Sequence, residues 1–148
     1  MNPNPILYEL LANPVENQGH YIEIFNPHSL TINLKKYKIC LKSGKSKEEN
    51  CMKLTNFELR PGEYYMICKN KLSIPNSKTC HQEETFRIVK NRKLSVSLAK
   101  SINNDNQYVD EMGVPSPRNY LGESRIRKGS RMSVFCGDFC WQWSTTIQ

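Results

Sequence analysis

The side chains that most often carry catalysis are scattered along this chain. Its three histidines, His20, His28 and His81, belong to no recognisable catalytic motif. No serine lies in a Gly-x-Ser-x-Gly turn, and no glycine-rich loop is present to cradle a phosphate. Asp110 and Glu111 would point to opposite faces of a strand, so we expect Asp110 to accept hydrogen bonds from backbone amides of a turn. The sequence therefore predicts a protein that is not an enzyme and uses no cofactor.

A basic cluster toward the C-terminus is the first candidate for binding. Arginine makes paired hydrogen bonds to carboxylate and phosphate groups, so arginines on a flexible segment can grip an anionic surface. The members of this cluster are Arg118, Arg125, Arg127, Lys128 and Arg131. Tyr120 lies nearby and could stack on a nucleic-acid base. A solvated tail that only adds solubility explains the same residues.

A second basic group lies earlier in the chain and has a simpler explanation. Its members are Lys35, Lys36, Lys38, Lys42, Lys45 and Lys47. Lysines along a strand edge prevent edge-to-edge aggregation, and this role needs no partner. The formal net charge of +7 would attract acidic protein surfaces, nucleic acid or anionic lipid. No apolar run approaches the roughly 20 residues of a membrane span, so we expect no membrane insertion.

Aromatic side chains gather at the end of the chain. They are Phe135, Phe139, Trp141 and Trp143. They either pack back on the fold as a last strand or form an exposed docking segment, because large apolar side chains left in solvent usually mark an interface. We therefore include Trp141 and Trp143 with the basic cluster as candidate partner-binding residues.

The six cysteines allow three interpretations. The first residues lack the basic region of a signal peptide, so we expect reduced thiols and an intracellular location rather than disulfides. Cys136 and Cys140 have a spacing that zinc sites permit, and Cys80 with His81 could complete four ligands. That spacing is not diagnostic, and we expect no metal.

Short alternating segments must position these side chains. In residues 20–27, Ile22 and Ile24 would share one strand face and Tyr21, Glu23 and Phe25 the other. Tyr64, Met66 and Cys68 alternate with Tyr65 and Ile67, so this strand is predicted to be buried on both sides or covered by a loop. The polar connection 69–84 is expected to be mobile or to contact a partner.

The pattern continues to about residue 114. Leu94, Val96 and Leu98 alternate with polar or small residues, and residues 103–106, Asn-Asn-Asp-Asn, predict a hairpin turn. About seven or eight such strands, without a sustained helical period, predict an all-β sandwich. We expect residues 1–114 to form the sandwich core. Residues 115–148 would be a basic and aromatic segment that could supply the last strand.

Four motifs in order resemble the lamin tail domain, an immunoglobulin-like module. They are Tyr-Ile-Glu-Ile-Phe-Asn-Pro at 21–27, then Ile32, Leu34 and Tyr37, then Leu-Arg-Pro-Gly-Glu-Tyr at 59–64, and Tyr-Val-Asp-Glu-Met-Gly at 108–113. The resemblance runs from about residue 6 to at least residue 125. It implies an immunoglobulin-like β-sandwich that binds proteins, and sometimes chromatin. The chain has no heptad run, so we do not expect it to form a lamin-type coiled coil.

These observations predict a non-catalytic interaction module. Its expected partners are proteins with acidic surfaces, such as a ciliary microtubule wall or a nuclear-lamina assembly, which would place it in the cytoskeleton, the cilium or the nucleus. The alternative is a nucleic-acid or chromatin-binding module that uses the basic cluster. Duplex DNA binding with a steep salt dependence would distinguish the second from the first.

Overall fold

The structure is a computed structural model, and it describes residues 3–16, 18–128 and 140–145. Nearly all of its regular structure is β-strand. The two helices in this part are short 3-10 turns, η1 (Lys71–Ser73) and η2 (Pro117–Asn119). No helix among the described residues is long and apolar enough to cross a membrane. The predicted all-β class is confirmed.

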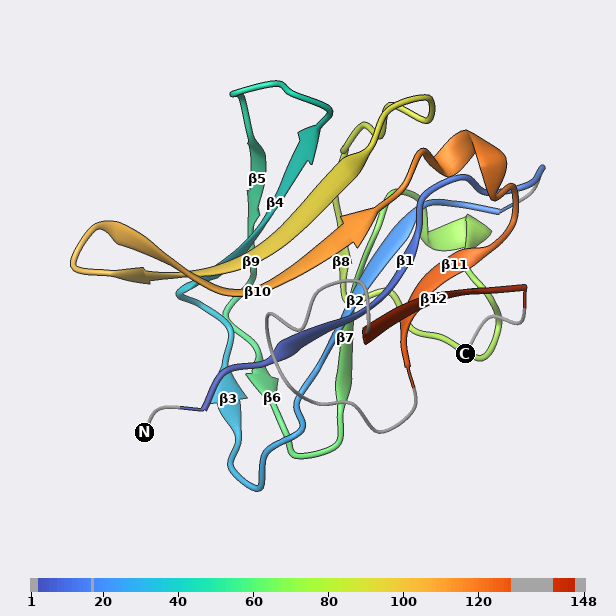
Figure 1. Cartoon of the computed structure of the whole chain (residues 1–148). Coiled ribbons are helices and arrows are strands. Elements are labelled where there is room, and N and C mark those ends of the chain that lie inside the picture. The colour runs from blue at the N-terminus through green and yellow to red at the C-terminus, as the bar shows by residue number, and fades with distance from the viewer. Residues whose placement is uncertain (1–2, 17, 129–139, 146–148) are drawn as a thin grey trace.

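Six strands form the larger sheet. In spatial order they are β12 (Trp141–Ser144), β11 (Ser124–Arg127), β1 (Ile6–Leu11), β2 (Tyr21–Phe25), β7 (Tyr64–Cys68) and β8 (Gln82–Glu83). All neighbours are antiparallel except β7 and β8, which are parallel. The strand predicted within residues 20–27, β2, lies between β1 and β7, in the interior of this sheet (Figure 1).

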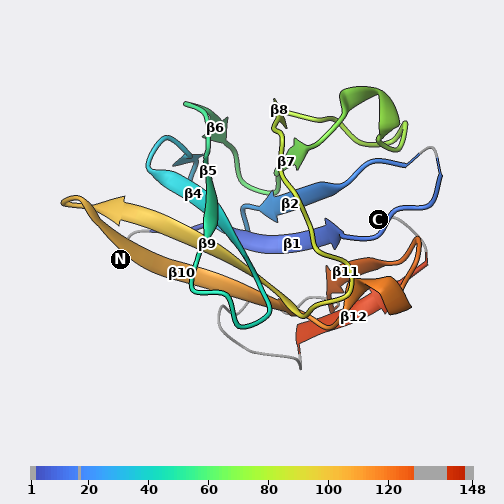
Figure 2. The same ribbon diagram turned by 90° about the horizontal axis from the view of Figure 1, so that it is seen from above.

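Four strands form the second sheet, and two short strands form a separate ribbon. The four-stranded sheet has the order β10 (Asp105–Val114), β9 (Leu94–Ile102), β4 (Tyr37–Ser43) and β5 (Asn50–Lys53). The ribbon pairs β3 (Ile32–Asn33) with β6 (Glu58–Leu59). Seen from above, β1 and β2 lie across from β9 and β10, so the two larger sheets form two layers (Figure 2).

The core lies between these layers and follows the predicted alternation. Ile22 and Ile24 of β2 belong to the same buried cluster as Val96 and Leu98 of β9. Fully burying one such aliphatic side chain stabilises the fold by roughly 1.5–3 kcal/mol. The strongest hairpin signal is also confirmed, because Asn103 and Asn104 join β9 to β10 with φ of 51° and 67°. Both values fit the left-handed backbone of a tight hairpin turn.

The segment after residue 114 is part of the larger sheet. β11 pairs with β1, and β12 pairs with β11, with Trp141 opposite Arg127 and Trp143 opposite Arg125. Of the two alternatives for the tryptophans, the last strand is therefore the one that the structure adopts. Phe135 and Phe139 lie outside the described residues.

Candidate functional site

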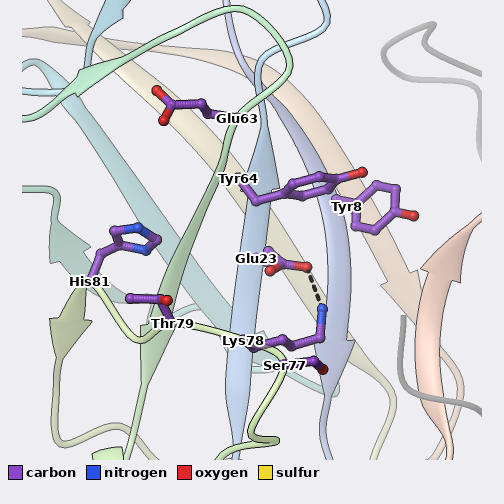
Figure 3. A pocket seen from close by; sticks show the side chains of 8 residues that line it. All are labelled: Tyr8, Glu23, Glu63, Tyr64, Ser77, Lys78, Thr79 and His81. Carbon is purple, nitrogen blue, oxygen red and sulfur yellow. Dashed lines mark hydrogen bonds and ion pairs between the residues drawn. The ribbon is translucent and has the colours of Figure 1, made fainter.

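A groove crosses the outer face of the six-stranded sheet, away from the sandwich core. Its volume is about 450 Å³, within the range of roughly 300–1,000 Å³ that is usual for ligand sites. Figure 3 shows the side chains that line it, contributed by β1, β2, the turn before β7, β7 itself and the connection from β7 to β8. They are Tyr8, Glu23, Glu63, Tyr64, Ser77, Lys78, Thr79 and His81.

A β-bulge places two consecutive side chains on this outer face. The register of β1 against β2 shifts between Leu7 and Glu9, so Tyr8 is the extra residue. Tyr8 packs against the ring of Tyr64 at 4.9 Å between centroids, while Glu9 lies directly opposite Glu23 on β2. The bulge thus brings a tyrosine and two carboxylates together at the groove.

Lys78 bridges the two glutamates. Its Nζ atom lies 3.0 Å from Oε1 of Glu23 and 3.4 Å from Oε1 of Glu9, and all three side chains are at most 7% exposed. The Tyr21 hydroxyl donates a further hydrogen bond to Glu9. Buried charges are costly unless they are paired and hydrogen-bonded, and this network supplies both kinds of partner.

Burial changes the titration of this network. Desolvation raises the pKa of Glu23 to about 7, with Lys78 opposing the shift and the charge of Glu9 adding to it. Burial also raises the pKa values of the Tyr8 and Tyr21 hydroxyls above their ordinary value. Because burial disfavours the charged carboxylate more than Lys78 stabilises it, the pKa of Glu23 lies close to neutral pH.

The connection between β7 and β8 buries the network because it folds back over the outer face. A disulfide joins Cys68 at the end of β7 to Cys80, and Ile74 packs against a buried cluster that includes Tyr21 and Met66. This cover explains why β7 is apolar on both faces, as predicted. The connection also carries Lys78, which lines the groove. The expectation that residues 69–84 are mobile or contact a partner stays a prediction.

The expectation of reduced thiols is wrong in this structure. A second disulfide joins Cys40 of β4 to Cys51 of β5, and Cys140 is also disulfide-bonded. Disulfides at 40–51 and 68–80 clamp neighbouring chain segments, 11 and 12 residues apart. Cys80 is therefore not free to supply the thiolate of the weighed zinc set, and Cys136 lies outside the described residues.

His81 is held by internal contacts rather than presented to the groove as a base. Its Nδ1 atom accepts a hydrogen bond from the Met66 amide at 3.0 Å, and its ring stacks on Tyr65 at 5.0 Å. Burial lowers the pKa of His81 below its ordinary value. The groove thus offers carboxylates, hydroxyls and aromatic rings arranged for binding.

Two members of the predicted basic cluster are buried, which corrects the expectation of an exposed flexible segment. Arg125 is 6% and Arg127 is 2% exposed, because both lie on β11 inside the larger sheet. Arg127 forms an ion pair with Asp110, and its Nε atom donates to the Leu7 carbonyl at 2.9 Å. Arg125 donates to the Gly113 carbonyl. Neither side chain is on the surface to grip a partner.

Asp110 satisfies the predicted need for backbone donors, but not in a turn. The Leu7 amide donates to Oδ2 at 2.8 Å and the Glu111 amide donates to Oδ1 at 2.9 Å. Both donors belong to strands. The Arg127 partner comes from the opposite sheet, which no sequence pattern indicated.

The two tryptophans predicted to bind a partner also pack against other side chains of the protein. Trp141 is 3% exposed and lies under the guanidinium of Arg127, 4.4 Å from the ring centre. The Trp143 ring is stacked on Tyr120 at 3.9 Å and contacts the Arg125 guanidinium at 5.2 Å. Tyr120 is therefore not free on that face to stack on a base.

A different basic surface appears where three connections meet, and we name it the basic pole. Its members are Lys42, Lys45, Lys47, Arg87, Lys90, Arg92, Lys93 and Arg118. The Gly44 amide donates to the Lys93 carbonyl at 2.6 Å, and the Arg118 amide donates to the Lys90 carbonyl at 2.8 Å. These bonds bring the three segments together, at the upper end of the view in Figure 1.

The basic pole combines residues that the sequence patterns had suggested as two separate groups with a run of residues that we had not singled out. Lys42, Lys45 and Lys47 were in the second basic group, and Arg118 was in the C-terminal cluster. The run 87–93, Arg-Ile-Val-Lys-Asn-Arg-Lys, was missed although its four basic residues are a visible signal. All members of the pole are exposed except the half-buried Lys42. Lys128 is half-buried, and Arg131 lies outside the described residues.

Comparison with known proteins does not assign the chain to a family. No protein-family model matches the chain, and no curated protein matches it either.

Proposed function

We propose that this chain is a non-catalytic interaction module that docks on acidic protein surfaces through the basic pole. The observation that carries this proposal is the charge at one end of the sandwich. Residues 42–49, 87–93 and 117–119 carry eight basic and two acidic side chains. Such an imbalance on an exposed surface attracts an acidic partner and speeds its association.

The rigidity of the pole supports docking rather than mere solubility. Gly44 has a φ of +57°, and the Arg92 side chain packs over it, 3.4 Å from where a Cβ atom would lie. The Cys40–Cys51 disulfide holds the two strands that this connection joins. Charges on a pre-organised surface lose less conformational entropy when they bind.

The resemblance to the lamin tail domain remains part of the proposal. It suggests a ciliary microtubule wall or a nuclear-lamina assembly as the acidic partner, in the cytoskeleton or the nucleus. The two disulfides count against a reducing compartment, because cytosolic and nuclear thiols are usually kept reduced. An acidic protein in an oxidising compartment therefore fits these residues better.

Two charge-reversal variants of equal net charge test this proposal. The pole variant changes Lys45, Lys90, Arg92 and Lys93 to Glu. The matched control changes four exposed lysines outside the pole, Lys35, Lys36, Lys69 and Lys71, to Glu. The probe is a fluorescent oligoglutamate peptide, and anisotropy at low salt reports its binding.

The pole variant should bind the peptide at least about ten-fold more weakly than the control variant, since each exposed ion pair contributes about 0.2–1 kcal/mol. Equal losses in the two variants would mean that only net charge matters and would contradict the proposal. Tighter binding of a short duplex DNA, with a steep salt dependence, would favour the nucleic-acid alternative instead.

A further inference from the structure

The groove of Figure 3 contains carboxylate charge that its internal partners do not use. Lys78 contacts Oε1 of Glu23, and among the described residues Oε2 accepts no hydrogen bond. The Glu23 side chain is 7% exposed and lines the groove, and Oε2 is not among the buried side-chain atoms without a partner, so a ligand in the groove can reach it. Hydrogen bonds to charged acceptors are stronger than those to neutral ones, so a ligand that brings a donor would be held at this oxygen.

The rest of the lining favours a cation as that ligand. Glu63 is exposed and uses Oε1 to accept a hydrogen bond from the Arg60 amide at 2.7 Å, which leaves Oε2 available. Lys78 is the cation of the groove lining, and both glutamates already hold it. The lining thus retains an excess of negative charge in a protein of net charge +7.

Aromatic rings complete the chemistry. Tyr64 is 40% exposed, and its ring contacts those of Tyr8 and Phe25 at 4.9 and 4.6 Å. These contacts hold the Tyr64 ring in place beside the carboxylates, as Figure 3 shows for Tyr8 and Tyr64. A planar guanidinium or an ammonium group is attracted to such a ring face.

We propose that this groove binds the cationic side chain of an arginine or lysine in an exposed segment of a partner protein. The N–H groups of the cation donate to Oε2 of Glu23 and to Glu63, and its flat or methylene part lies on Tyr64. Charge complementarity identifies the occupant as a basic segment. The site is separate from the basic pole and uses the opposite charge, so either proposal can fail alone.

Binding should be linked to proton release. The groups around Glu23 are Glu9 and Tyr8 of β1, Tyr21 of β2, Glu63 of the turn before β7, Tyr64 of β7, and Lys78 and His81 of the following connection. Of these, burial raises the pKa of Glu23 to about 7. Burial lowers the pKa of His81, so its imidazole is neutral at pH values above 6.5. A cation selects the ionised carboxylate, so affinity should rise as the pH increases from 6 to 8.

The test titrates the full chain with a blocked Gly-Gly-Arg-Gly-Gly peptide and follows NMR chemical shifts. The same peptide with citrulline is the neutral control, and free argininamide tests for a small-molecule amine. We expect the arginine peptide to bind at least about ten-fold more tightly than the citrulline peptide, because hydrogen bonds to charged groups are the stronger ones. Equal binding of the two peptides, or tighter binding of argininamide than of the arginine peptide, would overturn the proposal.

Matched surface variants localise the site. Tyr64→Leu and Glu63→Gln should each weaken peptide binding by about two- to five-fold, whereas Tyr108→Leu and Glu111→Gln, both in β10 of the other sheet, should not. Glu23→Gln mimics the protonated form and should abolish the pH dependence. Unchanged binding by Tyr64→Leu would contradict the proposal. Oligoglutamate binding should be the same in all these variants, which separates this site from the basic pole.

Discussion

Asp110 and Lys78 each take part in a buried ionic contact, and among the described residues the carboxylates outnumber the cation only at Lys78. Within the part of the chain that the structure describes, Asp110 pairs with Arg127, each side chain 1% exposed, and the backbone amides of Leu7 and Glu111 also donate to the carboxylate. Lys78 instead faces two carboxylates, Glu9 and Glu23, at the edge of an open groove.

The difference between the two clusters is one of role. The Asp110–Arg127 pair links β10 of one sheet to β11 and β1 of the other, so it fixes how the layers meet. The Lys78 cluster lies on the outer face, and its excess carboxylate titrates near neutral pH. The Asp110–Arg127 pair therefore serves the fold, while the excess carboxylate at Lys78 remains available for a ligand or a proton.

The largest effect is expected from breaking the Asp110–Arg127 pair. Asp110→Ala removes a buried carboxylate that pairs with the Arg127 charge, and should lower the free energy of unfolding by about 3–5 kcal/mol. Asp105→Ala on the exposed part of the same strand is the control and should change it by less than about 0.5 kcal/mol. Urea denaturation followed by tryptophan fluorescence measures both. Combining Asp110→Leu with Arg127→Met should recover most of the loss, and a further loss would show that the pair itself stabilises the fold.

Removing the disulfide that clamps the Lys78 connection should cost somewhat less. The chain-entropy relation gives about 3 kcal/mol for Cys68→Ala with Cys80→Ala, whose separation is 12 residues. The Cys40–Cys51 pair closes a similar loop and should cost a similar amount. Only the first variant should also weaken the pH dependence described next, because only that disulfide holds the cover over Glu23. Identical pH profiles of the two variants would contradict this assignment.

The pH dependence of stability distinguishes the two clusters most directly. Burial raises the pKa of Glu23 from 4.5 to about 7, so the folded state binds the extra proton between these values. Protonation of Glu23 therefore stabilises the folded state fully below pH 4.5. This contribution to the free energy of unfolding, up to about 3 kcal/mol, is lost as the pH rises through 7.

The two half-buried histidines, His20 and His81, act in the opposite direction below about pH 6.5, since partial burial lowers the pKa of each. The informative quantity is therefore the difference in the free energy of unfolding between the wild type and Glu23→Gln. The variant should be more stable than the wild type at pH 8, by up to about 3 kcal/mol, and about equal to it at pH 5. Glu48→Gln is the exposed control, and its difference from the wild type should not change with pH.

The smallest effect is expected at the basic pole. Reversing one of its exposed charges, as in Lys45→Glu or Arg92→Glu, should change the free energy of unfolding by no more than about 0.5 kcal/mol. Like charges repel there, so a small gain in stability is as consistent as a small loss. A loss above about 2 kcal/mol in thermal denaturation would show that the pole is part of the fold rather than a surface free for docking.

Much of the fold could be predicted because strand alternation is a local property. Ile22 and Ile24 face the core and Glu23 faces away from it, and the Asn103–Asn104 turn joins two strands, as their residue types indicate. The outer cover of β7 could be anticipated in the same way from an apolar residue at every position. The immunoglobulin-like connectivity stays a prediction that the lamin-tail resemblance alone suggests.

The candidate sites were less predictable because burial of a charged residue depends on its distant partners. Arg125 and Arg127 look like the basic pole residues Arg87 and Arg92 in sequence, yet the first two are buried and the last two are exposed. Glu9 and Glu23 are 14 positions apart, and only the bulged register of β1 against β2 sets them face to face. The thiol prediction failed for the same reason, since it used a compartment argument rather than the proximity of Cys68 and Cys80.

The sequence by itself determined the strands, their apolar faces and the tight turns, because neighbouring residues alone set those choices. Tertiary structure decided which charges were buried, which cysteines met and where the basic side chains gathered. Those outcomes depend on contacts between residues as far apart as Leu7 and Arg127, and no local pattern encodes such distances.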